Sequence, residues 1–166
     1  MSDFVEHTLN PVYNKQSKIL ILGTMPSPKS REYGFYYSHP QNRFWRIVSE
    51  LLEQNTPNTN EEKTSFLLKN RIALWDVLKS CEIDGADDSS IKNPVANDMT
   101  FLLQETNIKT IFTTGTKATA LYKKLCLPAT GIYSICLPST SPANCRHYSY
   151  ENLIESYRVI LNYLRE

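Results

Sequence analysis

The chain has 166 residues, of which 41% are hydrophobic, and this length accommodates one domain with a full core but not two. Its formal net charge of +1 excludes nucleic-acid binding by bulk charge alone, so such binding would depend on a local basic patch. No apolar run approaches membrane-spanning length, and the N-terminus carries no signal-peptide pattern. We therefore expect a single cytoplasmic domain over residues 1–166 that binds no membrane. The cysteines have no metal-ligand spacing and are predicted to be reduced thiols: Cys81, Cys126, Cys136 and Cys145.

Apolar runs typical of buried strands alternate along the chain with amphipathic helical patterns. The predicted strands are Lys18–Leu22, Ile72–Val77, Lys109–Thr114 and Ile132–Leu137. The first predicted helix opens near Pro40 or Gln41, and the others are Glu62–Asn70, Asp98–Thr106, Gly115–Lys124 and Tyr150–Leu164, the last capped by Ser149. The segment from Cys81 to Pro94 lacks periodicity and is predicted to be a long loop. This order predicts an α/β fold, a three-layer α/β/α sandwich with a central four-stranded parallel sheet.

Three of the loops that follow predicted strands carry side chains capable of chemistry. They are GTMPSPKS after the first strand, KSCEIDGADDSSIKN after the second and LPSTSPANCRHYS after the fourth. Ligands of parallel α/β sheets bind beyond the carboxyl ends of the strands, where such loops meet. Prolines in the first and last loops fix backbone torsions and so hold neighbouring polar groups in set directions. We therefore expect these loops to form one preorganised polar site.

The segments GTMPSPKSREYGFYYSHPQNRFW and LPSTSPAN resemble the two signature segments of the uracil-DNA glycosylase superfamily, specifically its hypoxanthine-DNA (deoxyinosine) glycosylase branch. The segment ALWDVLKSCEIDGADDSSIKN falls where the family has its middle loop, so the resemblance spans the chain. It implies a monofunctional DNA glycosylase of base excision repair that releases hypoxanthine, with uracil as a further candidate base and with no metal or cofactor. The implied partner is double-stranded DNA carrying a deaminated base, with single-stranded DNA as a second candidate, and we expect a monomer.

The resemblance also implies which residue serves the attacking water. Met25 stands where most branches carry an Asp, Asn or Glu for this purpose, so the role passes to Asn42. A neutral amide can orient water but cannot deprotonate it. The sequence departs from the branch at Ser27, where the usual residue is glycine, and this departure predicts a backbone less free to approach a ligand.

Base release requires hydrogen-bond donors to the leaving base and an aromatic surface for the flipped base. The residues expected to bind the base are Gly23, Thr24, Met25, Pro26, Tyr36, Tyr37 and Ser139, with Tyr37 favoured for stacking and Phe35 as an alternative. The residues expected to contact DNA are Ser27, Lys29, Arg43, Ser139, Thr140, Ser141, Pro142, Ala143, Asn144, Arg146 and His147. Further DNA contacts are considered at Arg31, Arg46, Ser89 and Ser90.

Other interpretations remain open from the sequence. A non-catalytic module could keep the pocket and bind damaged or single-stranded DNA, which Ser27 makes conceivable. Cys145 and His147 could serve a small-molecule hydrolase, although no orienting acid accompanies them. His39 is either a catalytic acid or, as we favour, a structural residue at the helix entry. An acidic stretch is interpreted as a solvated loop in preference to a metal site: Asp84, Asp87 and Asp88.

Overall fold

A four-stranded parallel sheet forms the centre of the computed structural model, which describes residues 2–144 and 147–165. Its strand order is β3-β2-β6-β7, and its in-register neighbours include Ile19 with Ile72 and Phe112 with Ile135. Every residue of β2 and β3 is buried, as expected of apolar strands covered on both faces. The predicted sheet is confirmed, with strand ends displaced by one or two residues: β2 (Ile19–Gly23), β3 (Ile72–Asp76), β6 (Thr110–Thr114) and β7 (Ser134–Leu137).

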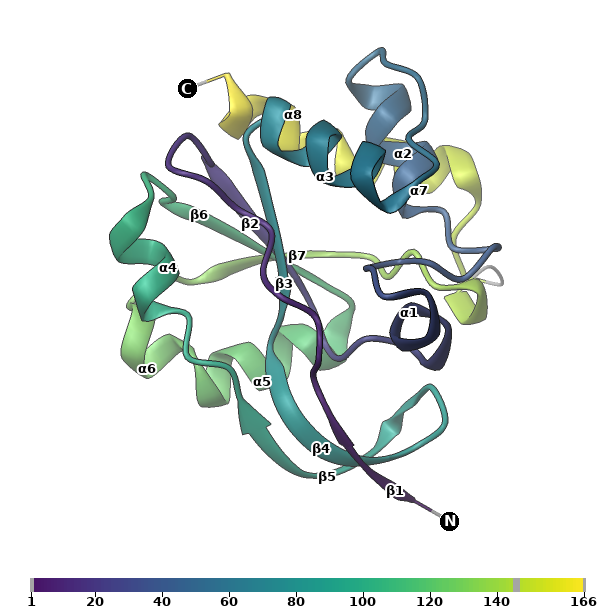
Figure 1. Cartoon of the computed structure of the whole chain (residues 1–166), viewed down its shortest axis with the longest axis vertical. Coiled ribbons are helices and arrows are strands. Elements are labelled where there is room, and N and C mark those ends of the chain that lie inside the picture. Colours follow the sequence, from purple (N-terminus) through teal and green to yellow (C-terminus); the bar gives the residue numbers. More distant parts are fainter. Residues whose placement is uncertain (1, 145–146, 166) are drawn as a thin grey trace.

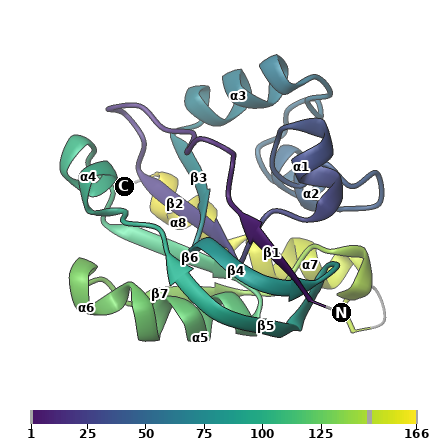
Figure 2. The same ribbon diagram turned by 60° about the horizontal axis from the view of Figure 1, so that its bottom comes forward.

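Helices cover both faces of this sheet, which confirms the three-layer sandwich. In Figures 1 and 2, α2 (Phe44–Leu51), α3 (Asn60–Lys69), α7 (Tyr150–Tyr157) and α8 (Val159–Leu164) lie on one side, and α5 (Thr116–Leu125) and α6 (Leu127–Thr130) lie on the other. Successive residues of β6 face opposite layers. The Phe112 ring packs on Tyr163 of α8 at 5.7 Å between centroids, whereas Thr113 Oγ1 lies 2.7 Å from Thr119 Oγ1 of α5.

A second, antiparallel sheet occupies the place of the predicted loop over Cys81–Pro94. It has the order β1-β4-β5 and comprises β1 (Asp3–Glu6), β4 (Leu78–Asp84) and β5 (Asp87–Ala96). The loop prediction was therefore wrong. Most of β5 is exposed, so its sequence lacks the apolar alternation that marks a half-buried strand. Gly85, in the left-handed region at φ +59°, forms the turn with Ala86.

Most helix ends differ from the prediction by one or two residues, and two helices differ by more. The helix expected to open at Pro40 or Gln41 begins at Phe44, after the N-cap residue Arg43, and Asn42 Oδ1 accepts the Phe44 N–H in the turn that precedes the helix. The closing helix is interrupted at Arg158 and forms α7 and α8. The predicted cap is confirmed, since Ser149 Oγ accepts from Asn152 N at 3.1 Å. The remaining short helices are α1 (Pro28–Tyr33), α4 (Thr100–Glu105) and the 3-10 turn Pro142–Asn144.

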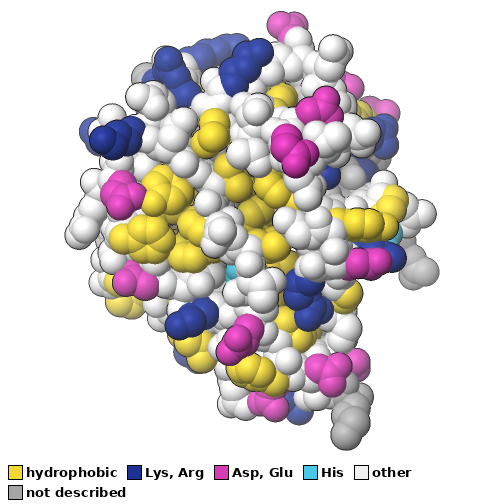
Figure 3. Space-filling model, in the orientation of Figure 1, with side chains coloured by type: hydrophobic (Ala, Val, Ile, Leu, Met, Phe, Trp, Pro, Cys, Tyr) yellow, Lys and Arg dark blue, Asp and Glu magenta, His cyan; other side chains and the backbone are white. Residues whose placement is uncertain are grey.

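The surface has no large region of one charge on the face that Figure 3 displays. Basic side chains gather along its upper left edge, acidic and basic side chains are mixed over the rest of the face, and apolar side chains gather near its centre and to the left of it. This distribution agrees with the formal net charge of +1. Within residues 2–144 and 147–165, none of the helices combines the length and the apolar character needed to span a membrane.

Candidate active site

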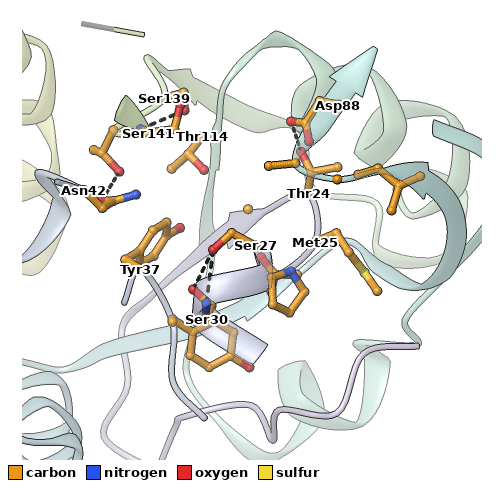
Figure 4. A pocket seen from close by; sticks show the side chains of 18 residues that line it. Thr24, Met25, Ser27, Ser30, Tyr37, Asn42, Asp88, Thr114, Ser139 and Ser141 are labelled. Carbon is orange, nitrogen blue, oxygen red and sulfur yellow. Dashed lines mark hydrogen bonds between the residues drawn. The ribbon is translucent and has the colours of Figure 1, made fainter. Parts of the chain in front are cut away.

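A polar pocket of about 140 Å³ lies at the carboxyl ends of the parallel strands. Figure 4 shows the side chains that converge on it from the β2 loop, the segment before α2, the β4–β5 hairpin and the loop after β7. The predicted convergence of the three post-strand loops is thus confirmed. The pocket is lined by Gly23, Thr24, Met25, Pro26, Ser27, Ser30, Tyr36, Tyr37, Asn42, Asp76, Ile83, Gly85, Ala86, Asp88, Thr114, Ser139, Thr140 and Ser141.

Ser27 ends the β2 loop and caps α1. Its backbone has φ −64° and ψ 164°, an extended conformation that any residue adopts, and its Oγ accepts from Ser30 N at 3.2 Å. The Ser27 and Ser30 hydroxyl oxygens lie 3.2 Å apart, as Figure 4 shows. The torsions of Ser27 therefore need no glycine, while the predicted effect of serine on the approach of a ligand stays a prediction. Serine fits this turn, and its hydroxyl gives the turn a cap that glycine lacks.

Asn42 is half-buried and lies two residues before α2, so its predicted place in the first turn is corrected. Its Oδ1 accepts from Phe44 N at 2.9 Å and from Thr140 Oγ1 at 2.8 Å. A backbone N–H can only donate, so the amide oxygen must be the atom that faces Phe44. Both acceptor positions of Oδ1 are then occupied. The NH2 group is the part of Asn42 left to act in the pocket, and it can only donate.

The loop after β7 is held against α2 by Arg43. Arg43 N donates to Thr140 O at 3.2 Å, and Arg43 Nη1 donates to Tyr148 O at 2.7 Å. Arg43 is only 8% exposed, so this geometry contradicts its predicted contact with DNA and gives it a role in fixing the loop. Within the loop, Asn144 Nδ2 donates to Ser139 O at 2.9 Å, and Ser141 N donates to Ser139 Oγ at 3.2 Å. Ser139 and Ser141 line the pocket, whereas Ala143 is exposed and Pro142 is half-buried.

The three neighbouring aromatic residues divide into core and pocket. Phe35 and Tyr36 are buried in the core, where Tyr36 Oη donates to Asn10 O at 2.8 Å, and part of Tyr36 also lines the pocket. Tyr37 has a left-handed backbone at φ +54°, and its ring stacks on Phe44 at 4.1 Å between centroids. Its hydroxyl is buried without a hydrogen-bond partner among the described residues, and burial raises the pKa of Tyr37 far above its ordinary value. Tyr37 therefore offers the pocket a neutral hydroxyl and at most one ring face.

Asp76 and His7 belong to the site although sequence reasoning did not select either. Asp76 ends β3 and lines the pocket, and its Oδ2 lies 2.9 Å from His7 Nε2. The His7 and Asp76 side chains are 2% and 6% exposed. The available signal was a single aspartate at the end of the apolar run IALWD, which we interpreted as strand interior.

Comparison with known proteins identifies the family. The sequence model of the uracil DNA glycosylase superfamily matches residues 11–165. The chain belongs to this superfamily. Among curated relatives, hypoxanthine DNA glycosylase of Methanosarcina acetivorans is 38% identical over 137 residues, which cover 81% of this chain and 85% of that protein. The Methanosarcina barkeri protein of the same name is 33% identical over 138 residues, which cover 82% of this chain and 86% of the relative.

The fold is also shared with a solved superfamily structure. The solution NMR structure of a Methanosarcina acetivorans protein, described as a candidate uracil DNA glycosylase, superposes with a TM-score of 0.83 at 31% sequence identity. The match covers 99% of this chain and 100% of that structure. The resemblance inferred from the signature segments is thereby confirmed, as are the α/β fold and the family.

In this superfamily member the β4–β5 hairpin contributes Asp88 to the pocket. Thr24 Oγ1 donates to Asp88 Oδ2 at 3.2 Å and so joins the β2 loop to the hairpin (Figure 4). Although much of Asp88 is exposed, partial desolvation of its carboxyl raises the pKa of Asp88, and the nearby Asp76 raises it further. Sequence reasoning placed Asp88 in a solvated loop, because the hairpin itself was not predicted.

The basic residues near the first signature segment differ in what they can reach. Lys29 is partly exposed and lies 3.3 Å from Glu32 Oε2. Arg46 is exposed and its guanidinium lies 4.7 Å from the centre of the Tyr150 ring. Arg31 is half-buried. Lys29 and Arg46 thus remain available for phosphate, unlike Arg43. His147 is exposed, whereas Arg146 lies outside the described residues.

The geometry bears on two of the open alternatives. His39 Nδ1 accepts from Gln41 N at 3.1 Å in the turn before α2, which supports the structural interpretation of this residue. His39 is also absent from the pocket lining. Cys145 lies outside the described residues, so the Cys145 and His147 pair has no described geometry. Within residues 2–144 and 147–165, no three His, Cys, Asp or Glu side chains cluster as metal ligands would.

Proposed function

We propose that this chain is a monofunctional DNA glycosylase that hydrolyses the N-glycosidic bond of deoxyinosine in DNA and releases hypoxanthine. The observation that carries the proposal is one pocket built from both signature segments of the superfamily, with an amide, hydroxyls and a carboxylate directed into it. Two relatives that align with more than 80% of the chain bear the name hypoxanthine DNA glycosylase, which supports hypoxanthine as the released base. Uracil remains a second candidate.

The size and polarity of the pocket support a single extruded base as the ligand. Its volume of about 140 Å³ is well below the roughly 300 Å³ at which sites for drug-sized ligands begin. A duplex base must leave the stack to enter such a site. Hypoxanthine presents acceptors at O6 and N7 and a donor at its ring N–H, so it can pair with both the donors and the acceptors of the lining.

We infer that Asn42 acts as a donor toward the leaving base. N-glycosidic cleavage develops cationic charge on the sugar and negative charge on the base, so a donor to the base lowers the barrier. Because Asn42 Oδ1 is occupied by Phe44 and Thr140, its NH2 group is the free part. An N–H that donates to the water oxygen would weaken that water as a nucleophile. Donation to the base therefore replaces the earlier expectation of water positioning through the amide oxygen.

The expected cellular context follows from the substrate. We propose that the protein acts as a cytoplasmic monomer on double-stranded DNA, with single-stranded DNA as a second candidate substrate. A non-catalytic binding module was conceivable because of Ser27, but the ordinary backbone and helix-capping role of that residue remove its support.

The deciding experiment uses end-labelled duplexes that carry one deoxyinosine or one deoxyuridine. After incubation with the protein, alkali cleaves abasic sites and a denaturing gel displays them. We expect cleavage at deoxyinosine. Asn42→Ala should lower the single-turnover rate by roughly 100-fold or more, as does loss of one preorganised donor in other enzymes. A variant with unchanged turnover would contradict the role of Asn42, and an intact deoxyinosine duplex would contradict the function.

A further inference from the structure

His7 is bonded in a way that fixes both its own proton and the orientation of Asp76. Leu9 N donates to His7 Nδ1 at 3.3 Å, and a backbone N–H can only donate, so Nδ1 must be unprotonated. The ring proton of neutral His7 therefore sits on Nε2 and is donated to Asp76 Oδ2 at 2.9 Å. His7 Nε2–H thus occupies Oδ2 of Asp76, and the second carboxylate oxygen, Oδ1, points away from His7.

Asp76 Oδ1 is the oxygen that faces the pocket. It lies 2.6 Å from the position that a Cβ on Gly23 would occupy, and Tyr37 Oη and Thr114 Oγ1 lie 3.4 Å and 3.7 Å from the same position. All four residues line the pocket. Among the described residues, Asp76 Oδ1 accepts no hydrogen bond, and the Tyr37 hydroxyl is likewise unpaired and buried. An unpaired acceptor on a residue that lines the pocket and a buried hydroxyl without a partner among the described residues indicate a place for a polar ligand.

Strand pairing and ring packing fix the N-terminal segment that carries His7 beside Asp76. His7 N donates to Lys79 O at 2.7 Å as an extension of the pairing between β1 and β4. Its ring packs near Tyr36 and Trp75, at 6.1 Å and 6.4 Å between centroids. His7 precedes residues 11–165, the part that the superfamily model matches. The superfamily model therefore does not extend to His7.

We propose that His7 is a positioning residue that holds the Asp76 carboxylate, through Oδ2, so that Oδ1 accepts the ring N–H of the extruded base. This inference rests on the proposed function. Deamination of adenine converts a ring nitrogen from an acceptor into an N–H donor, and deamination of cytosine does the same. An ionised carboxylate can only accept, so it pairs with the deaminated base and opposes the parent base. His7 keeps this acceptor correctly turned.

The test is a double-mutant cycle on the deoxyinosine duplex under single-turnover conditions. His7→Phe keeps an aromatic ring beside Tyr36 and Trp75 but removes the N–H donor, and it should lower the rate of base release by about tenfold or more. Asp76→Asn should lower the rate further. In the Asp76→Asn background, His7→Phe should have little additional effect, because its action passes through the carboxylate. His7→Gln, whose amide can donate to Asp76, should recover part of the rate.

Two readouts separate positioning from a general loss of structure. Affinity for a duplex with a tetrahydrofuran abasic analogue should be unchanged in His7→Phe, because this analogue has no base to meet Asp76. Tyr13→Phe is the matched control, since it removes the hydrogen bond from the same N-terminal segment to Glu105 outside the pocket lining, and it should keep the native rate. A native rate in His7→Phe, or additive effects in the double mutant, would overturn the inference. An inactive native protein would instead refute the proposed function.

Discussion

Gly23 shows how one position constrains the pocket at the residue scale. It ends β2, and it is covered by a carboxylate oxygen, a phenolic oxygen and a hydroxyl oxygen from three other segments. A Cβ at this position would lie 2.6 Å from Asp76 Oδ1, closer than real Cβ contacts come. The glycine is thus required by close approach and not by its own torsions. The need for glycine at position 23 follows from contacts with Asp76, Tyr37 and Thr114, which lie outside the motif GTMPS.

Gly23→Ala should therefore damage the pocket more than the fold. The added methyl group must displace Asp76, with an expected loss of about 1–3 kcal/mol in the free energy of unfolding and a large loss of base release. Urea denaturation and single-turnover kinetics measure the two effects. Gly131→Ala is the control, because its Cβ meets open space and only its φ of +70° is strained. It should cost about 1 kcal/mol and leave base release unchanged. Native activity in Gly23→Ala would show that Asp76 moves freely.

At the scale of elements, the strands of the parallel sheet could be predicted because buried strands consist of short apolar runs that are visible in the sequence. The run ILILG is buried throughout, and so is IALWD. The β4–β5 hairpin could not be predicted, since its exposed second strand carries mostly polar residues. Asp76 was not recognised as a site residue, because it stands at the end of an apolar run that was assigned to the strand interior. The position of Asn42 was predicted from the motif, but the second hydrogen bond to its amide oxygen comes from Thr140, 98 residues later.

Ser27 offers a test of one element, the short helix α1. Because its φ of −64° suits any residue, Ser27→Gly should lose only a few tenths of a kcal/mol of stability and keep base release close to native. Ser27→Ala removes the bond to Ser30 N and should cost about 1 kcal/mol. Urea denaturation compares these variants, with Ser149→Ala as the matched cap deletion at α7. Strong activation by Ser27→Gly would show that serine does restrict this turn.

The positive and negative charges of the whole molecule nearly balance, so DNA binding depends on the region beside the pocket. A groove of about 1240 Å³ adjoins the pocket and shares with it the residues Ala86, Asp88, Thr114, Ser139 and Ser141. Lys117 of α5 and the hairpin residues Asp84, Asp87 and Asp88 all line this groove. With a formal net charge of +1, the protein has little long-range attraction for DNA. Recognition therefore depends on short-range contacts near the pocket.

The carboxylate of Asp88 in the β4–β5 hairpin also affects the free energy of unfolding. Its surroundings decide whether that effect grows or shrinks as the pH rises. Desolvation raises the pKa of Asp88 above its ordinary value of 3.8, so above pH 4 the folded protein holds this proton more tightly than the unfolded chain does. The stability that Asp88 contributes is thus complete below pH 4 and is lost as the pH rises through the folded-state pKa. Asp88→Asn should raise stability at pH 7, because its amide oxygen can still accept from Thr24. This gain should vanish as the pH falls toward 4.

Asp98→Asn provides a control of opposite sign. Hydrogen bonds from the Thr100 hydroxyl and backbone N–H lower the pKa of Asp98, so its contribution is present at neutral pH and is lost as the pH falls. Its replacement should destabilise the protein at pH 7, and the loss should shrink in acid. Urea midpoints of the native protein and both variants between pH 2 and pH 8 measure the two trends. A less stable Asp88→Asn protein at pH 7 would mean that the ionised carboxylate is favourable in the folded state, held by Thr24 and Lys117 against its desolvation.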